Sequence, residues 1–342
     1  MAEMPRRRRS VLVVLGLLLL AEGLSRLGAV QRLFDPADGS TEAARWRYAY
    51  AQATPTVLVM GDSRAVIDLS PTEIRNSVQA QAGGDISVLS IASYGSSAEH
   101  AYLMLTEVVL KSVPSPELVL LNVSDVALND RTWIDTPPLY LRGLSRPLAP
   151  ETWRSAPGRA AVLETLSGLV RLRHRSRLTV EGRWPNYIRG SETYDCGGSV
   201  WHDKMRPEAL QQQFSKSRDE YLVDFCPDGV QGDYLLRLLR QARAAGVHLV
   251  LVITPVTEQY LSAFPAPGDA QRFVDFVHAA GAAHGVPVLD YYRTAELEDE
   301  HYFDLHHTNA EGTALFSRLV TRDIVVPALA DWQDFCSQHA AR

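Results

Sequence analysis

The feature that most constrains the fold of this chain is a repeated alternation of short apolar runs with longer amphipathic runs. The apolar runs have the length of strands buried on both faces, and they lie at residues 56–60, 86–92, 118–123, 248–253 and 286–289. Runs with helical periodicity follow at residues 71–82, 97–111, 234–245, 270–284 and 310–320. This alternation predicts an α/β fold with a parallel sheet of about five strands, covered by helices on both faces. Ligands of such sheets bind beyond the carboxyl ends of the strands.

Charge and cysteine content exclude several classes of protein. The net charge is −6, whereas a general nucleic-acid-binding protein is normally basic, so we expect no nucleic-acid partner. The three cysteines, Cys196, Cys226 and Cys336, form no CxxC pair, which removes zinc-finger and thioredoxin-like functions. In an oxidising compartment Cys196 and Cys226 are the favoured disulfide partners, although sequence cannot fix the pairing. We expect no cofactor.

The first 34 residues differ from the rest of the chain. Four arginines, Arg6 to Arg9, precede an apolar run over residues 11–21. A helix over residues 10–32 would be about 34 Å long and could cross a bilayer, with the arginines on the cytoplasmic side. The alternative is a cleaved signal peptide, because Ala21-Glu22-Gly23 resembles a cleavage site. Both interpretations place the remainder outside the cytoplasm, either membrane-anchored or secreted.

The rest of the chain is divided by one long irregular segment. We expect residues 1–34 to be a signal-anchor helix and residues 35–54 to be a linker. A catalytic domain would then comprise residues 55–129 and 227–325, interrupted by an insertion at 130–226 and followed by a tail at 326–342. The insertion lacks clear periodicity apart from a helical run near residues 160–173, and its length indicates a cap or another functional insertion.

Three short polar segments follow predicted strands. The first is Gly61-Asp62-Ser63, where glycine permits a sharp turn that leaves a serine at the carboxyl edge of the sheet. The second contains Gly95, whose backbone N–H could face a substrate oxygen. The third is Asp304-Leu-His-His307, in which the carboxylate could orient the imidazole of His307 while its other nitrogen faces Ser63. Together they indicate a serine nucleophile activated by a histidine base.

Each segment also has a simpler interpretation. Ser63 could cap a helix, and Gly95 could lie in an ordinary strand-to-helix turn. The third segment could be a polar loop that ends in the helix cap Asn309. A metal site is a separate alternative because four candidate ligands cluster here, namely His301, Asp304, His306 and His307. It would leave Ser63 and Gly95 without a role, so we expect no metal.

Taken together, these segments resemble the SGNH/GDSL hydrolase superfamily over about residues 56–320. Gly61-Asp62-Ser63 matches the first block of the family, Gly95 the glycine of the second, and Asp304-x-x-His307 the last. The resemblance implies a three-layer α/β/α sandwich and a catalytic triad of Ser63, Asp304 and His307. It also implies that the backbone N–H groups of Ser63 and Gly95 form part of an oxyanion hole.

One block departs from the family pattern. The family usually has Gly-x-Asn-Asp after the third strand, with the asparagine donating to the oxyanion, whereas this chain has Asn122-Val-Ser-Asp125. Asn122 is our candidate for the missing donor, and Ser124 or Asn129 could replace it. Loss of one such donor typically lowers the rate by about 10²–10³.

A looser resemblance concerns the whole architecture. The N-terminal helix, the segment Leu251-Val-Ile-Thr-Pro255 and the ending around His307 are similar to membrane-tethered SGNH proteins that modify cell-envelope polymers. These include the lipoteichoic-acid D-alanylation protein and the alginate O-acetylation proteins. The resemblance implies a serine esterase or O-acyltransferase acting on envelope carbohydrate or lipid esters, with a multipass membrane acyltransferase as a possible partner.

Two questions about function stay open at this level. A catalytically weak or inactive subunit that binds or assembles an envelope-modification complex is the alternative to an enzyme, because fold does not guarantee activity. The insertion contains basic and aromatic residues that could bind an anionic glycan or could form a solvated basic face around core aromatics. They are Arg171, Arg173, Arg175, Arg177, Arg183, Trp184, Tyr187 and Trp201.

Overall fold

The computed structural model describes residues 55–110, 115–133, 192–195, 198–294 and 296–339, together with Leu20, Glu22 and Gly23. Its centre is a sheet of five parallel strands in the order β2-β1-β3-β6-β7. The strands are β1 (Val57–Met60), β2 (Val88–Ser90), β3 (Leu118–Asn122), β6 (Leu249–Ile253) and β7 (Val288–Asp290). Each strand overlaps one of the predicted apolar runs, so the predicted α/β fold with a parallel five-stranded sheet is confirmed.

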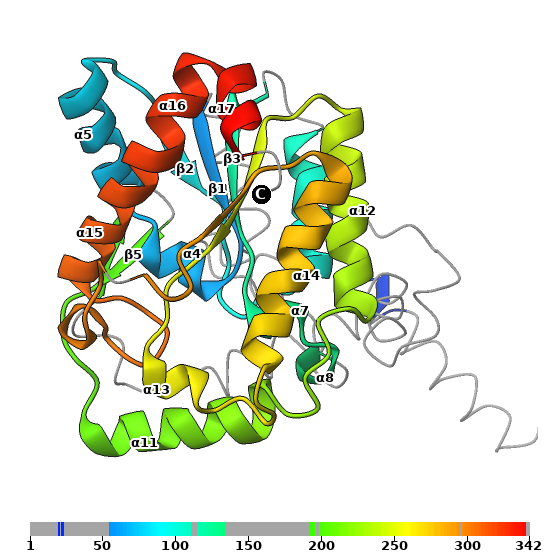
Figure 1. The fold of residues 1–342 in the computed structure, drawn as a ribbon, viewed down its shortest axis with the longest axis vertical. Coiled ribbons are helices and arrows are strands. Elements are labelled where there is room, and N and C mark those ends of the chain that lie inside the picture. The colour runs from blue at the N-terminus through cyan, green and yellow to red at the C-terminus, as the bar shows by residue number, and fades with distance from the viewer. Residues whose placement is uncertain are drawn as a thin grey trace, which may run out of the picture.

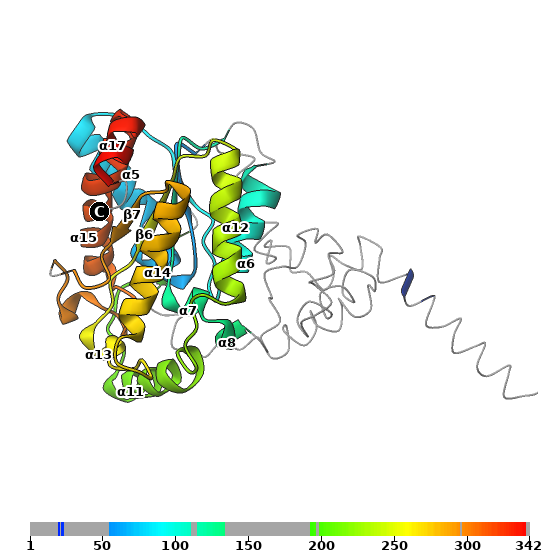
Figure 2. The same cartoon turned by 45° about the vertical axis from the view of Figure 1, so that its right-hand side comes forward.

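Helices cover both faces of this sheet (Figures 1 and 2). One layer packs through a first core cluster and consists of α6 (Ala98–Met104), α12 (Val230–Ala244) and α14 (Asp269–His284). The opposite layer packs through a second cluster and contains α4 (Ser63–Asp68), α5 (Pro71–Ala82), α15 (Ala310–Val320), η6 (Thr321–Val325) and α16 (Val326–Ala330). The result is a three-layer α/β/α arrangement.

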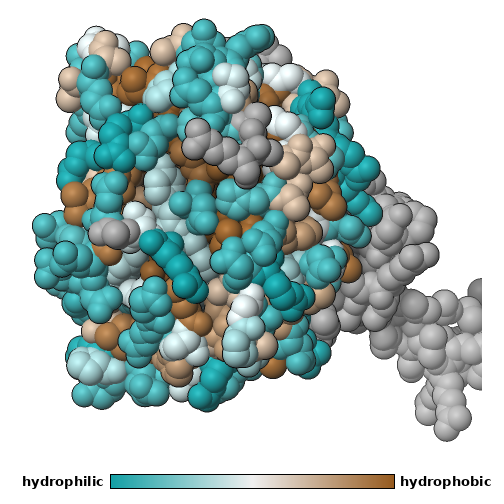
Figure 3. Space-filling model, viewed as in Figure 1, coloured by the Kyte–Doolittle hydropathy of each residue, from teal (hydrophilic) through white to brown (hydrophobic). Residues whose placement is uncertain are grey.

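The strands are apolar throughout because alternate side chains enter different cores. In β3, Val119 and Leu121 join the cluster beneath α6, α12 and α14. Leu118 and Leu120 join the cluster on the α4 and α15 side. All four side chains are buried, which is the burial pattern of a parallel sheet that is covered twice. The face drawn in Figure 3 mixes hydrophilic and hydrophobic residues without one dominant apolar area.

Several helices differ from the expected ones. The helix predicted at residues 97–111 is α6 followed by the π-helical turn η1 (Leu105–Val109), and α12 begins four residues earlier than predicted. Sequence periodicity did not predict α4, because six residues are too few to establish a helical period. The expected tail instead contains α16 and α17 (Trp332–His339), and the aromatic ring of Phe335 is buried in the second core cluster.

The long insertion is described only in part. It contributes α8 (Asp130–Trp133), the hairpin of β4 (Glu192–Asp195) and β5 (Gly198–Trp201), α11 (Pro207–Lys216) and η4 (Ser217–Tyr221). The helical run predicted near residues 160–173 lies outside the described residues. Two further short helices lie along the sheet edge, α7 (Asp125–Leu128) and α13 (Glu258–Leu261), and η5 (Asp299–His301) precedes the histidine loop.

The predicted N-terminal helix and disulfide have separate outcomes. In the described part of the chain no helix combines the length and the hydropathy needed to cross a bilayer. The predicted signal-anchor helix lies almost entirely outside that part, where only Leu20, Glu22 and Gly23 are described. Cys226 and Cys336 are free thiols, so the expected Cys196–Cys226 disulfide is not seen, and Cys196 itself lies outside the described residues.

Candidate active site

The turn after β1 places Ser63 at the carboxyl edge of the sheet. Gly61 has a φ of 140°, and a Cβ there would lie 2.8 Å from the Cβ of Asn122, so the turn requires glycine. Asp62 is the N-cap of α4 and accepts a 3.0 Å hydrogen bond from the backbone N–H of Arg64. Ser63 is therefore the first helical residue and is only partly buried. The simpler interpretation of Ser63 as a helix cap does not hold, because Asp62 is the cap, and the Ser63 hydroxyl instead meets a histidine.

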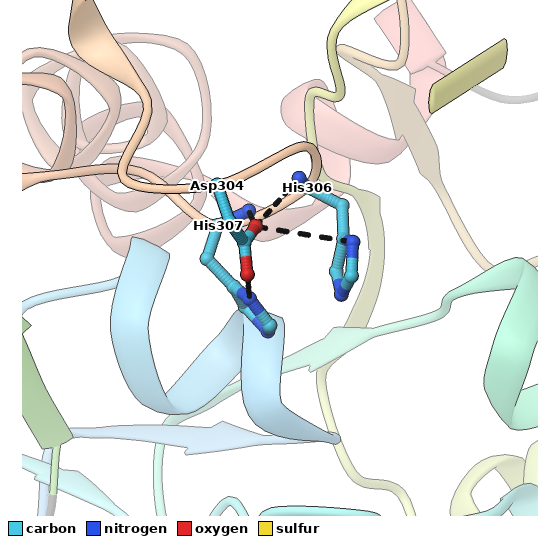
Figure 4. A group of neighbouring side chains, drawn as sticks. All are labelled: Asp304, His306 and His307. Carbon is cyan, nitrogen blue, oxygen red and sulfur yellow. Dashed lines mark hydrogen bonds and ion pairs between the residues drawn. The ribbon is translucent and has the colours of Figure 1, made fainter. Parts of the chain in front are cut away.

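The loop between η5 and α15 supplies that histidine and its carboxylate partner (Figure 4). The loop is tight, because the backbone N–H of Phe303 donates to the carbonyl of His307 at 2.9 Å. One oxygen of Asp304 accepts from the backbone N–H groups of His306 and His307, both at 2.8 Å. Its other oxygen lies 2.8 Å from Nδ1 of His307, and Nε2 of His307 lies 2.9 Å from Oγ of Ser63. The three residues form one continuous hydrogen-bonded chain.

Electrostatics adjust the two titrating members of this chain in opposite directions. Burial would raise the pKa of Asp304, but the adjacent His307 and His306, with the hydrogen bonds to its carboxylate, bring that pKa well below its usual range. Burial lowers the pKa of His307, whereas the Asp304 carboxylate outweighs this and raises it above the ordinary value. Asp304 thus stays ionised, and the imidazole has enhanced basicity.

His306 belongs to the same cluster but does not complete the hydrogen-bonded chain. Its ring centroid lies 4.2 Å from that of His307 and 4.9 Å from that of Tyr260. Burial holds its pKa well below the ordinary value, so the ring is neutral. The neutral ring of His306 therefore packs beside the ring of the base.

A buried tryptophan from the insertion also contacts the base. Trp201 ends β5, and its ring centroid lies 5.3 Å from that of His307 and 4.2 Å from that of Phe303. It is the described member of the proposed basic and aromatic surface; the five arginines of that set, Trp184 and Tyr187 lie outside the described residues. In the structure Trp201 is thus part of the core around the histidine and not part of an exposed surface.

Gly95 lies in the turn that follows β2. The backbone N–H of Ser93 donates to the carbonyl of Gly61 at 3.0 Å, which anchors the segment after β2 against the Ser63 turn. Gly95 itself has a φ of 62°, is exposed, and has no atom within 4 Å of a hypothetical Cβ. The left-handed conformation explains the glycine, and the open space beside it leaves room for a ligand.

The three candidates for a further oxyanion donor all have other partners. The side-chain amide of Asn122 donates to Oγ1 of Thr254 at 3.1 Å and to a carbonyl of β6 at 3.5 Å. Ser124 caps α7 and hydrogen-bonds the Asp62 carboxylate, while Asn129 donates to the carbonyl of Tyr221 at 2.7 Å. The structure therefore gives Asn122 a different role, which is to join β3 to β6 next to the nucleophile turn. Sequence could not show this, because the partners are 130 and 132 residues away.

A buried charged cluster, the Arg64 cluster, lies directly behind the nucleophile and was not foreseen. It consists of Arg64, Asp125, Tyr260 and Tyr292. One guanidinium nitrogen of Arg64 lies 2.9 Å from Oδ1 and 3.2 Å from Oδ2 of Asp125, and 2.9 Å from the hydroxyl of Tyr260. Both tyrosine hydroxyls also donate to the Asp125 carboxylate. The only sequence signal was a charged residue within four residues of the end of each of two buried strands, Arg64 after β1 and Asp125 after β3.

The geometry fits a triad better than a metal site. Ligand atoms of Asp304, His306 and His307 all lie within 4.8 Å of one another. Both ring nitrogens of His307 are already hydrogen-bonded, to Asp304 and to Ser63, so a metal there would have to break the triad. His301, the fourth candidate ligand, instead accepts from the backbone N–H of Glu298 at 2.9 Å as part of the cap of η5.

Comparison with known proteins gives structural likenesses only. No protein-family model matches the sequence, and no curated protein does. The chain is similar to the crystal structure of a lipase/acylhydrolase from Enterococcus faecalis, with 14% identity over 79% of this chain and 96% of that chain, at a TM-score of 0.41. It is also similar to a GDSL-like lipase from Bacteroides thetaiotaomicron, with 13% identity over 84% of this chain and 98% of that chain, at a TM-score of 0.41. What the site can do follows from its own residues.

Proposed function

We propose that this chain is an SGNH-type serine hydrolase that acts on carboxylic esters, with Ser63 as nucleophile, His307 as general base and Asp304 as the group that orients the base. The observation that carries the proposal is the continuous chain from Ser63 Oγ to His307 Nε2 at 2.9 Å and from His307 Nδ1 to Asp304 at 2.8 Å. It joins segments 244 residues apart. Neither a helix cap nor a polar loop would need that alignment.

The geometry supports a two-stage acyl transfer. With its Nδ1–H donated to Asp304, His307 presents the lone pair of Nε2 to the Ser63 hydroxyl. As Oγ bonds to the ester carbon, its proton passes to Nε2 and the carbonyl electron pair moves to oxygen. The backbone N–H groups of Ser63 and Gly95 are the donors we propose for that oxyanion. Collapse breaks the bond to the alcohol, which takes the proton from His307 and leaves an acyl-serine.

The second stage regenerates the serine. Water, or a hydroxyl of an acceptor, gives its proton to His307 as its oxygen attacks the acyl-serine carbon. The second tetrahedral species collapses and returns the proton to Oγ of Ser63. Hydrolysis and transfer share these residues and differ only in the acceptor. Within this proposal the substrate is an acyl ester of a cell-envelope carbohydrate or lipid, and the domain lies outside the cytoplasm, tethered through residues 1–34 beside a membrane acyltransferase.

A fluorophosphonate probe tests the chemistry directly, because it phosphonylates a serine only where a base activates it. We expect the wild type to be labelled and Ser63→Ala not to be labelled. Ser262→Ala is the matched control, since Ser262 is exposed and its hydroxyl bonds only the nearby carbonyl of Gln259; it should label like the wild type. Absence of label on folded wild type would favour the alternative of a binding or assembly subunit.

The substrate needs a second measurement. Incubation with short-chain esters of a sugar and of a glycerolipid, followed by mass spectrometry of the peptide that contains Ser63, would identify the trapped acyl group. We expect an acyl adduct on Ser63 in the wild type that forms much more slowly in Asp304→Asn, because acylation needs the oriented base. An adduct on any other residue would contradict the assignment of the nucleophile.

A further inference from the structure

We propose that Asp68, a residue outside the triad, is a positioning residue for His307: it ties the loop that carries the base to the helix that carries the nucleophile and keeps a second carboxylate near the imidazole. The inference rests on the proposed function for its catalytic meaning. Asp68 is the last residue of α4, the six-residue helix that begins at Ser63. One short helix thus bears the nucleophile at one end and this carboxylate at the other.

The contact that carries the proposal is made with the residue directly after the base. Oδ1 of Asp68 accepts two hydrogen bonds from Thr308, one from its backbone N–H and one from its hydroxyl, each at 2.9 Å. Both residues are 0% exposed. We call this pair of hydrogen bonds the Asp68 clasp. Because Thr308 is covalently joined to His307, any shift of the clasp moves the imidazole relative to Ser63. Asp68 has no hydrogen bond to the reacting groups, so it acts through Thr308.

Neighbouring buried contacts strengthen the same junction. The hydroxyl of Thr313 donates to the carbonyl of Ile67 at 3.1 Å, and the backbone N–H of Ser70 donates to the hydroxyl of Ser317 at 2.9 Å. Thr313 and Ser317 belong to α15, the helix that follows the histidine loop. The Thr313 bond joins α4 to α15, and the Ser70 bond joins the N-cap of α5 to α15. The Asp68 clasp reaches the loop itself, as the bond between His307 and Ser63 also does.

A carboxylate is a costly choice for this position, which suggests that its charge has a use. Its second oxygen, Oδ2, is buried and has no hydrogen-bond partner among the residues that the structure describes. Burial raises the pKa of Asp68 to about 7, although the nearby His307, the bonds from Thr308 and Arg64 oppose this. An asparagine would accept the same two bonds without that penalty.

The nearby titratable groups show what the charge can do. The groups that face Asp68 are His307 and Tyr302 from the loop and Arg64 from its own helix. Asp68 adds to Asp304 in raising the pKa of His307. When His307 gains the serine proton, a second ionised carboxylate nearby stabilises the imidazolium. The clasp therefore combines placement of the ring with stabilisation of its charged form.

The test separates the clasp from the charge with three variants. Asp68→Asn keeps the acceptor for Thr308 and removes the charge, and Asp68→Ala removes both. Thr308→Val removes the hydroxyl bonds to Asp68 and Thr313 and keeps both the charge and the backbone bond. Each variant is assayed at pH 8, where Asp68 is ionised, for kcat and KM with p-nitrophenyl acetate. The pKa of His307 is followed by NMR of ring-labelled histidine, and thermal unfolding is recorded for every variant.

We expect Asp68→Asn to lower kcat about tenfold with little change in KM, because the imidazolium then loses the stabilisation that the second carboxylate gives it. It should lower the pKa of His307 and raise the melting temperature. The expected rise in melting temperature follows from the linkage between protonation of Asp68 and folding. The folded pKa of Asp68 is raised, so the folded state binds more protons and loses stability as pH rises from about 4 to about 7. Asp68→Ala should lose more kcat than Asp68→Asn, and Thr308→Val less.

The outcomes distinguish this inference from the function on which it rests. A wild type that does not react with the probe or the ester would end the proposed function, while the NMR titration would still show whether Asp68 acts on His307. An unchanged pKa of His307 in Asp68→Asn, or wild-type kcat in both Asp68 variants, would overturn the inference. If Asp68→Ala does not fold, Asp68→Asn decides alone, because loss of kcat in a more stable protein is not a folding defect.

Discussion

Ser63 and Arg64 are consecutive residues, yet they belong to two charged assemblies with opposite properties. Ser63 is partly exposed and makes one side-chain contact with the base, at 2.9 Å. Arg64 is 1% exposed and paired with Asp125, which is 0% exposed. The Arg64 cluster ties the carboxyl ends of β1, β3, β6 and β7 together, whereas the triad joins only the nucleophile turn to one loop.

The difference separates a reacting site from its support. In the triad a hydrogen bond joins Ser63 to His307, and the serine is partly exposed. In the Arg64 cluster every member is buried, and Asp125 accepts from one guanidinium and two phenols, so its geometry is fixed. Loss of a triad member should therefore reduce activity with little effect on folding, and loss of an Arg64-cluster member should do the reverse.

The largest expected effect is on catalysis. His307→Ala should lower kcat on the order of 10⁶-fold, as removal of a triad base does elsewhere, because nothing then accepts the serine proton. Steady-state hydrolysis of p-nitrophenyl acetate measures this, with urea unfolding as the stability readout. His278→Ala, a half-exposed histidine on α14, is the control and should keep full activity. Appreciable activity in His307→Ala would show that His307 is not the base and that the triad is not the reacting site.

Asp304→Asn should have the next largest effect and lower kcat about 10⁴-fold. The amide oxygen can still accept the backbone N–H groups of His306 and His307, but the amide nitrogen would donate to Nδ1 and turn the ring into the wrong tautomer. KM should change little. Full activity in this variant would show that Asp304 only shapes the loop.

Arg64→Ala should act mainly on stability and lower the free energy of unfolding by about 3–5 kcal/mol, because it leaves Asp125 buried without its counter-ion. Chemical denaturation with two probes measures the change. Arg218→Ala is the matched control, since it removes an arginine from a surface ion pair with Asp219 and should have no measurable effect. An Arg64→Ala variant that is as stable as the wild type but has greatly reduced kcat would instead show that Arg64 serves catalysis and not stability.

The smallest expected effect is the pH dependence of the wild type. Neutral His307 is the active base, and its pKa is raised above 6.5 by Asp304, so kcat/KM should rise with pH and level off only above that value. Below the pKa the loss should be about tenfold per pH unit. A plateau already reached at pH 5 would contradict the assignment of His307 as the base.

Much of the fold and the outline of the site followed from local pattern. Apolar runs of strand length gave β1, β3 and β6 because their residues are buried on both faces. Ser63, Gly95 and Asp304 could be grouped in advance, since each follows a strand or precedes a helix at the edge where parallel strands end. The short helix α4 and the two C-terminal helices were missed, because they are too short to show a period.

The sequence by itself determined the order of strands and helices and the residue types that lie at one edge of the sheet. Periodicity and strand direction depend only on residues that are close together in the sequence. The tertiary structure alone decided the partners. Asn122 donates to β6 and to Thr254, Arg64 pairs with Asp125, and Asp68 holds Thr308 across 240 residues. Most buried polar groups find a hydrogen-bond partner, but the chemistry of the group does not specify which distant residue provides it.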